Sequence, residues 1–483
     1  MHPAVILRIL GILLMLYSAT LLVPALVALL YSEAELGRFL YSFLVTLVSG
    51  LLCWLPVQNR RQELRVRDGF VLVLLFWTVL SGYGALPYLL TDQQPLSITD
   101  AVFESVSGLT TTGATILTQI DILPRSLLYY RQQQQWLGGM GIIVLAVAIL
   151  PMLGVGGMQL YRAEAPGPVK DSKLTPRVTE TARALWLIYV NLTALCALAY
   201  WLGGMSLFDA ICHAYSTLSI GGFSTHTANF AYFDSAKLEA VAIIFMLLGG
   251  MNFGLHFMAW RRRSLNVYRH DGEVRFYFLV IGAMATLSVT GLWISVQYDS
   301  AWLGLRHGLF EAVSVVTTTG YSVTSFSTWH PMLAMALIMA SFIGACAGST
   351  GGGIKMVRAN LMIRQGLREM HRLMHPNAVI LVKFSGKAVP DRVVEAVWGF
   401  FGIYLLAFCT LFIALLLTGV DFLTGFSAVA ACLNNLGPGL GKVASHYADL
   451  NVTAKWILCC AMLLGRLEIF TLLVLFTPMF WRH

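Results

Sequence analysis

The sequence predicts an all-α polytopic membrane protein: four repeats of helix, pore helix, filter turn and helix around a central pore, preceded by two N-terminal transmembrane helices. Three observations predict this fold. Hydrophobic residues make up 57% of the 483-residue chain and charged residues 12%, whereas soluble domains carry about 25% charged residues. Several apolar runs exceed the roughly 20 residues that cross a bilayer core. Four shorter apolar segments end in similar turns that contain glycine.

The long apolar runs are the expected membrane-spanning helices. The first run lacks a cleavage site of small residues after a short apolar core, so we expect a retained helix rather than a removed signal peptide. The eight cysteines lie in or beside apolar segments without CxxC spacing, which favours reduced structural thiols. The runs cover 5–30, 39–57, 69–91, 136–158, 184–204, 238–260, 276–297, 393–419 and 456–481.

The four shorter segments carry the strongest functional signal. Each follows a predicted pore helix that is roughly 20 Å long and therefore too short to span a bilayer. These helices are expected near 97–109, 206–217, 304–316 and 422–433. The turns are SGLTTTGAT at 107–115, STLSIGGFST at 216–225, SVVTTTGYSV at 314–323 and CLNNLGPGLG at 432–441, with candidate glycines Gly113, Gly221, Gly320 and Gly437.

Four such turns at matching positions favour a cation path. Backbone carbonyls can replace the water shell of a dehydrated cation, and glycine permits the backbone angles that turn them inward. Non-helical backbone at membrane depth is tolerated only where it is buried in protein or lines a wet cavity. A single Thr-Thr-Gly is usually an ordinary loop, whereas fourfold recurrence indicates one shared pore. The partly negative C-terminal ends of the pore helices also favour a cation.

The chain divides into two N-terminal helices at 1–62 and four repeats at 63–165, 166–265, 266–375 and 376–483. The net charge of +8 indicates topology rather than a nucleic-acid partner, because most basic residues gather in alternate connections. They cluster at 60–67, 162–183, 261–275 and 355–392. The positive-inside rule therefore predicts that both termini are cytoplasmic and that all four turns face the other side.

A glycine-rich segment, GACAGSTGGGIK at 344–355, interrupts the inner helix of repeat three. Three consecutive glycines, at 351–353, are expected to break that helix, because each costs about 1 kcal/mol relative to alanine. The inner helices of the other repeats are expected to be unbroken. We interpret the segment as an intramembrane gating loop that contains Gly348, Gly351, Gly352, Gly353 and Lys355. The alternatives are close helix packing and a phosphate-binding loop, which Ile354 disfavours because it separates the glycines from the lysine.

Arg466 is a charge inside the last apolar run, and such charges are by default functional. It is interpreted as an electrostatic barrier below the turns, with Lys355 as a second positive charge; the alternative is a buried pair with Glu468. Four acidic residues lie in the predicted pore helices: Asp100, Glu104, Asp209 and Glu311. Their expected roles are to cap the helix N-termini, to stabilise the neighbouring turns or to attract cations. His213 and His256 have no metal-ligand cluster around them in the sequence.

Three motifs give the chain a family resemblance along nearly its whole length. They are QWLGGMGIIVLAVAILPMLGVGGMQLYRAE at 135–164, GACAGSTGGGIKMVR at 344–358 and LLGRLEIFTLLVLFTPMFW at 463–481. The chain resembles the TrkH potassium-uptake subunits of the bacterial Trk/Ktr and plant HKT cation transporter superfamily. This resemblance implies that potassium is the ion and that its ligands are carbonyls of Thr111 and Thr112, Ile220 and Gly221, Thr318 and Thr319, and Asn435 and Leu436, with the adjoining glycines, including Gly437, shaping the turns.

The expected function is potassium-selective uptake across the bacterial inner membrane, by channel-like conduction through a carbonyl filter. The resemblance implies a TrkA-like cytoplasmic nucleotide-binding ring as regulatory partner, docked on 355–392, and a homodimer. Membrane lipid is a further partner of the basic face. The alternatives are secondary transport of potassium coupled to proton or sodium, and a membrane-embedded enzyme or pump subunit. No catalytic pair or nucleotide fold stands out in the sequence, so we expect neither enzymatic activity nor an organic cofactor.

Overall fold

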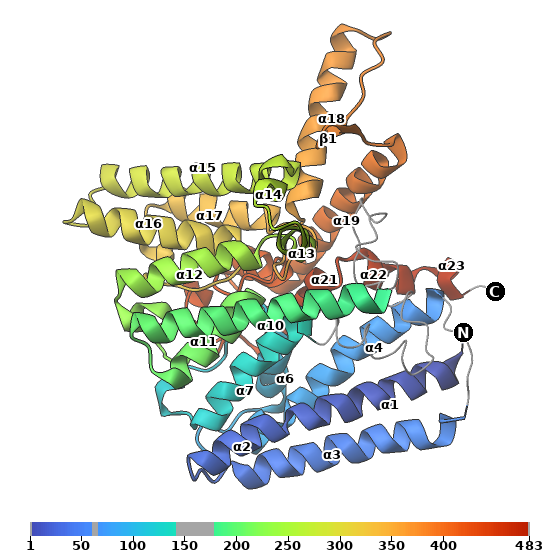
Figure 1. The fold of residues 1–483 in the computed structure, drawn as a ribbon, viewed down its shortest axis with the longest axis vertical. Helices are drawn as coiled ribbons and strands as arrows, with labels where there is room; N and C mark the ends of the chain where they lie inside the picture. Colours follow the sequence, from blue (N-terminus) through green and yellow to red (C-terminus); the bar gives the residue numbers. More distant parts are fainter. Residues whose placement is uncertain (1, 60–65, 142–177, 482–483) are drawn as a thin grey trace.

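The computed structural model describes residues 2–59, 66–141 and 178–481, and these form an almost entirely helical protein (Figure 1). Within these residues six helical segments are long and apolar enough to cross a membrane, or seven if one bent pair counts as a single span. The six are Pro3–Leu30, Leu36–Val57, Arg67–Leu90, Arg183–Gly203, Gly272–Ile294 and Asp391–Leu416. Most of the predicted span 136–158 lies outside the described residues.

Two helical segments precede the repeats, as expected. The first consists of α1 (Pro3–Thr20) and α2 (Leu22–Leu30), and α3 (Leu36–Trp54) returns beside it. The two helices cross closely at a pair of glycines: a Cβ built on Gly11 would lie 2.7 Å from the Gly50 carbonyl oxygen. Such close approach is typical of small residues at membrane helix contacts.

The four pore helices are present within a few residues of the predicted positions. They are α6 (Ile98–Leu109), α11 (Leu207–Ser219), α16 (Ala301–Val316) and α20 (Phe422–Leu433). Three of them begin at side-chain caps, in which Ser97, Ser206 and Asp421 accept the backbone N–H three residues further on. These caps satisfy amide donors that the first turn of a helix leaves unpaired.

The outer helices of the repeats are largely continuous. They are α4 (Val66–Gly84) with α5 (Leu86–Leu90), α10 (Val178–Gly203), α15 (Gly272–Ile294) and α19 (Asp391–Leu416). The inner helices are α7 (Arg125–Trp136) with the π-helical turn η3 (Leu137–Gly141), α12 (Ala236–Gly249) with α13 (Phe253–Arg262), α17 (Pro331–Ile343) with α18 (Met356–Met374), and α21 (Val452–Arg466) with α22 (Phe470–Leu473), η7 (Val474–Phe476) and α23 (Pro478–Trp481).

The prediction that only the inner helix of repeat three is broken was wrong. In repeat two, α12 and α13 meet at an angle of 94°, and in repeat four the helix ends at Arg466, before Glu468 and Ile469 take positive φ values. The break in repeat two frees the carbonyls of Gly249 and Gly250. These accept backbone N–H groups from residues 344–355, so the backbone groups released by the break stay paired within the protein.

Short elements complete the described chain. They are η1 (Leu55–Val57), η2 (Ile120–Ile122), η4 (Asn229–Phe233), α14 (Asn266–His270), η5 (Phe326–Thr328), η6 (Gly441–Val443) and a hairpin of β1 (Lys383–Phe384) and β2 (Lys387–Ala388). Helix α18 stands out from the body of the molecule, and α1 begins at the same end of the bundle at which α23 ends (Figure 1). One large core cluster joins α1, α4, α6 and α20, and a second joins α10, α11 and α15.

Candidate functional site

The four turns after the pore helices have the same backbone conformation. Each has a non-glycine residue with φ between 53° and 63°, followed two positions later by a glycine with φ between 78° and 96°. The first positions are Thr111, Ile220, Thr318 and Asn435, and the glycines are Gly113, Gly222, Gly320 and Gly437. The candidate glycine of repeat two is therefore Gly222 rather than Gly221, which corresponds to Thr112, Thr319 and Leu436. Aligning SIGG with TTTG and NNLG over four residues would have revealed this register.

These four turns close a ring, called the turn ring below. Each glycine lies against a carbonyl oxygen of the next repeat, at the position just before that repeat's own glycine. A Cβ built on Gly113 would lie 2.2 Å from the oxygen of Gly221, on Gly222 2.2 Å from that of Thr319, on Gly320 2.0 Å from that of Leu436, and on Gly437 2.6 Å from that of Thr112. The contacts run from repeat one to two, three, four and back to one. No side chain fits at these glycines without moving neighbouring backbone.

The four turns are not all held by the same hydrogen bonds. In repeats one and three, threonine hydroxyls bond across the turn at 2.7 Å, between Thr110 and Thr112 and between Thr317 and Thr319. In repeat four, the Asn435 amide donates to the Thr112 hydroxyl at 2.9 Å. The hydroxyl of Tyr447 donates to the carbonyl of Gly437 at 2.6 Å. The turn of repeat two is held from outside, by a residue of α7.

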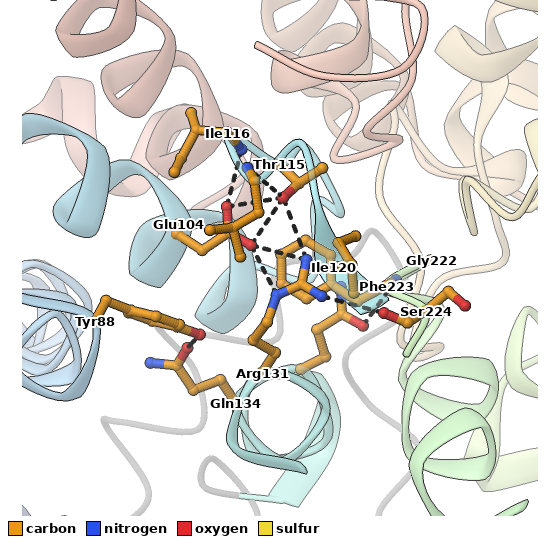
Figure 2. A network of polar contacts seen from close by, with 12 residues as sticks. Tyr88, Glu104, Thr115, Ile116, Ile120, Arg131, Gln134, Gly222, Phe223 and Ser224 are labelled. Atoms are coloured by element: carbon orange, nitrogen blue, oxygen red, sulfur yellow. Dashed lines mark hydrogen bonds and ion pairs between the residues drawn. The ribbon is translucent and has the colours of Figure 1, made fainter. Parts of the chain in front are cut away.

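Two buried pore-helix carboxylates brace the chain after the turns. Glu104 accepts the backbone N–H of Ile116 at 3.0 Å, and Glu311 accepts that of Val323 at 2.9 Å. Each amide lies three residues after its glycine, so the two carboxylates are equivalent braces. Arg131 donates to Glu104 at 2.9 Å (Figure 2).

Arg131 links this brace to repeat two. Its guanidinium donates to the carbonyl oxygen of Ser224 at 3.1 Å and lies over the ring of Phe223 (Figure 2). Both Glu104 and Arg131 are fully buried. Breaking a buried pair leaves an uncompensated charge, which assigns Glu104 a structural role. The sequence reasoning had singled out Glu104 but missed Arg131.

The other two acidic residues also have partners. Asp100 accepts from the Lys455 ammonium at 2.6 Å, which ties the pore helix of repeat one to the inner helix of repeat four. Asp209 accepts from the Thr225 hydroxyl at 2.7 Å and lies 3.5 Å from the His226 ring. All four acidic residues therefore make structural contacts within the described protein.

A cavity of about 250 Å³ opens on one side of the turn ring. Its lining comes from all four repeats and includes the four glycines of the ring together with His226 and Tyr447. Most of the lining residues follow the turn glycines in the chain. The cavity therefore lies on the side of the ring where the chain leaves each turn. It gives access to the backbone of the ring from this side.

The segment 344–355, called the glycine loop, lies on the opposite side of the turn ring. The hydroxyl of Thr350 donates to the carbonyl of Leu218 at 2.9 Å, and the N–H of Gly352 donates to the Thr318 hydroxyl at 2.8 Å. A Cβ built on Gly352 would lie 2.0 Å from the Asn434 carbonyl oxygen. The expected break in this inner helix is thus present, and the loop contacts repeats two, three and four directly beneath their turns.

Arg466 connects the glycine loop to repeat one. Its guanidinium donates to the carbonyls of Gly138 and Gly139, at 2.5 and 2.7 Å, and to the carbonyl of Thr350 at 2.9 Å. It also donates to the Thr111 hydroxyl at 3.2 Å, so the charge lies next to the turn ring. Lys355 donates to the carbonyl of Gly351 at 2.5 Å within the loop.

The alternative pairing of Arg466 with Glu468 was wrong. Glu468 instead accepts from Arg358, which lies in the first turn of α18, at 2.5 Å. Glu468 follows the end of α21, where the helix has already broken.

Two further residues that the sequence reasoning missed hold the glycine loop. The buried Glu273 on α15 accepts the backbone N–H of Ala347 at 2.8 Å and of Val357 at 3.1 Å, and so ties both ends of the loop. Asn252, at the bend of repeat two, packs against the loop. A Cβ built on Gly348 would lie 3.1 Å from the side-chain amide oxygen of Asn252. No sequence pattern marks Glu273, because its partners are backbone groups far along the chain.

The donor set suits a monovalent cation better than a transition metal. The described residues contain no group of three or more His, Cys, Asp or Glu side chains that could hold a metal ion. Backbone carbonyls are instead the ligands by which membrane proteins replace the water around an alkali cation. The fold and this site together define a polytopic α-helical membrane transport protein whose four re-entrant turns close a ring.

Comparison with known proteins gives the family. The TrkH family, described as a cation transport protein, matches residues 36–483, and the chain belongs to this family. The Trk system potassium uptake protein TrkH of Halomonas elongata is 55% identical over 482 residues, covering 100% of both chains. The protein of the same name in Escherichia coli K12 is 52% identical over 483 residues, again 100% of both.

A solved structure agrees with the fold. The crystal structure of the potassium transporter TrkH from Vibrio parahaemolyticus superposes with a TM-score of 0.91 at 50% identity, covering 100% of both chains. The predicted family and the predicted all-α membrane fold are therefore confirmed. Members of this family are membrane cation transporters and not enzymes, which also confirms the expected non-enzymatic class.

Proposed function

We propose that this protein takes up potassium across the bacterial inner membrane by channel-like conduction through the turn ring. The observation that carries the proposal is the closure of the ring, in which each turn glycine lies against a carbonyl of the next repeat. Such a ring can present carbonyl oxygens from four repeats to one dehydrated ion. The relatives that cover the whole chain are named potassium uptake proteins, which supports potassium as the substrate.

The ligands in this proposal are eight backbone carbonyls, two from each turn. They belong to Thr111 and Thr112, Ile220 and Gly221, Thr318 and Thr319, and Asn435 and Leu436. Their support is the shared backbone conformation of the four turns. The glycines Gly113, Gly222, Gly320 and Gly437 set the geometry of the turns without supplying these oxygens.

The glycine loop and Arg466 form the proposed gate. The loop lies against the turns of three repeats, and Arg466 joins it to the fourth. A positive charge beside the ring raises the energy of a cation that leaves it. Because the Thr350 carbonyl of the loop accepts from Arg466, movement of the loop would also displace this charge. One movement would then open the path and weaken the electrostatic barrier.

The proposed orientation places both termini, α18 and the glycine loop on the cytoplasmic side. It is supported by the basic residues of the connections, which follow the positive-inside rule, and by the common end at which α1 begins and α23 ends (Figure 1). The cavity beside the ring then faces the periplasm and receives the incoming ion.

The proposed orientation makes α18 a surface on which a cytoplasmic partner can dock. Helix α18 stands away from the bundle and exposes apolar side chains, among them Ile363, Leu367 and Met370 (Figure 1). This surface suits a TrkA-like nucleotide-binding ring, whose movement would reach the glycine loop through Met356. A homodimer and anionic lipid at the basic face complete the proposed assembly.

The test is ion flux in proteoliposomes that contain the purified protein. A channel-like path predicts that current reverses at the potassium equilibrium potential at every pH and sodium concentration. A reversal potential that follows the proton or sodium gradient would show coupled secondary transport instead. Addition of the nucleotide-binding partner should change the flux without moving the reversal potential.

A further inference from the structure

We propose that Gln135 is a positioning residue for the ion path, because it holds the Gly221 carbonyl of the turn ring and thereby sets ion selectivity. The proposal rests on the proposed function of the ring. Gln135 lies on α7, the inner helix of repeat one, and its side chain reaches the turn of repeat two. It is fully buried.

The amide of Gln135 makes three hydrogen bonds to this one turn. Its Nε2 donates to the carbonyl oxygen of Gly221 at 2.6 Å. Its Oε1 accepts from the Ser216 hydroxyl at 2.7 Å and from the Phe223 N–H at 3.2 Å. The partners fix the orientation of the amide, since Gly221 O can only accept and Phe223 N–H can only donate. Both ends of the turn are thus tied to one side chain.

Gln135 also explains why repeat two alone has glycine at this position of the ring. The equivalent residues are Thr112, Thr319 and Leu436, which all carry side chains. A Cβ built on Gly221 would lie 2.3 Å from Cδ of Gln135. The φ of Gly221 lies outside the left-handed region, so the space taken by Gln135, and not the backbone conformation, excludes a side chain.

The hydrogen bond makes one member of the carbonyl ring unlike the others. The Gly221 oxygen has two lone pairs, and Gln135 uses one of them. A donor at 2.6 Å holds the carbonyl in place and reduces the negative charge it can offer to an ion. Selectivity depends on the number and field strength of coordinating carbonyls, so this contact acts on discrimination between ions and not only on folding.

The test compares Gln135→Met, which keeps the side-chain volume but removes the amide, with Gln133→Met. Gln133 lies on the same helix and is buried, and it donates to the carbonyl of Thr20, away from the turn ring. Potassium and sodium fluxes are measured in proteoliposomes. We expect the potassium-to-sodium ratio to fall about fivefold in Gln135→Met, the equivalent of one lost hydrogen bond, and to stay at the wild-type value in Gln133→Met. An unchanged ratio in both variants would overturn the proposal.

A second measurement decides the matter if Gln135→Met does not fold. Gly221→Ala should lower the melting temperature because its Cβ meets Gln135. Adding Gln135→Ala should restore the melting temperature by making room, but should leave the potassium-to-sodium ratio below the wild-type value because the amide that holds the Gly221 carbonyl is absent. A double variant no more stable than Gly221→Ala alone, or a stable one with the wild-type ratio, would contradict the proposal. Gly320→Ser, in the turn of the neighbouring repeat three, separates the two hypotheses. If it changes the ion ratio while Gln135→Met does not, only the role of Gln135 fails; if neither does, the turn ring is not the filter.

Discussion

Arg358 and Glu468 pair at 2.5 Å between the first turn of α18 and the broken end of the last inner helix. This pair distinguishes the roles of Arg466 and Glu468, two charged residues that lie close together in the sequence. Glu468 neutralises Arg358, whereas Arg466 donates to backbone carbonyls beside the turn ring. The Arg466 guanidinium also donates to the Thr111 hydroxyl, so it lies next to the turn ring.

Removing this charge should increase conduction. We expect Arg466→Ala to raise potassium flux more than tenfold, because unit charges about 8 Å apart repel by roughly 2 kcal/mol at an effective dielectric near 20. Arg466→Lys keeps the charge and should remain close to the wild-type flux. The measurement is potassium flux in proteoliposomes with equal protein content, and an equal or lower flux in a folded Arg466→Ala protein would favour a purely structural role.

Substitution of the turn glycines should weaken selectivity. Gly113→Ser, Gly222→Ser and Gly320→Ser each place a side chain at a left-handed φ, at a cost of about 1–2 kcal/mol, and against a carbonyl of the next repeat. We expect the potassium-to-sodium flux ratio to fall about tenfold in each. Gly366→Ser is the control, since a Cβ there would meet no atom within 4 Å. Wild-type ion competition in all three turn variants would argue against the filter.

Shortening the glycine loop should separate gating from selectivity. Deletion of part of Gly348–Gly353 removes contacts to the turns of repeats two and three but no proposed ligand. We expect higher basal flux, weaker control by the nucleotide-binding partner and an unchanged ion ratio. Flux measured with and without partner and nucleotide tests this expectation. Control at wild-type strength with unchanged basal flux would place the gate elsewhere.

The buried pair of Glu104 and Arg131 should dominate local stability. Glu104→Gln leaves the Arg131 charge buried without its carboxylate, and such losses cost about 3–5 kcal/mol. We expect a marked drop in the melting temperature of the detergent-solubilised protein. The double variant Glu104→Gln with Arg131→Met removes the unpaired charge and should recover part of the loss. Equal melting temperatures for the single variant and the wild type would show that the pair is dispensable.

The His226 contacts predict a pH dependence of stability. Burial alone would lower the pKa of His226, but hydrogen bonds with Asp209 and Asp121 outweigh burial and raise the pKa above 6.5. A raised pKa means that the protonated histidine stabilises the fold. The contribution is complete below the unfolded-state pKa of about 6.5 and is lost as the pH rises through the folded-state value.

We therefore expect wild type to exceed His226→Asn in melting temperature by more at pH 6 than at pH 8. Melting curves of both proteins across this range provide the measurement. A gap that is constant with pH, or that grows as the pH rises, would contradict the assigned charge state.

Local sequence determined the pore helices and their turns. Caps such as Ser97 and Ser206, apolar length and the glycine after each helix are short-range signals, so α6, α11, α16 and α20 begin and end within a few residues of their predicted positions. The break in the third inner helix was likewise visible, because three successive glycines disfavour a helix whatever surrounds them.

Only the tertiary structure decided the bend of the inner helix of repeat two and the partner of Glu468. In each case the deciding contact joins distant parts of the chain: Gly250 accepts the N–H of Cys346, and Glu468 binds Arg358. A buried backbone or charged group must find a partner wherever the fold supplies one. Since those partners lie about 100 residues away in the chain, no local pattern could reveal them.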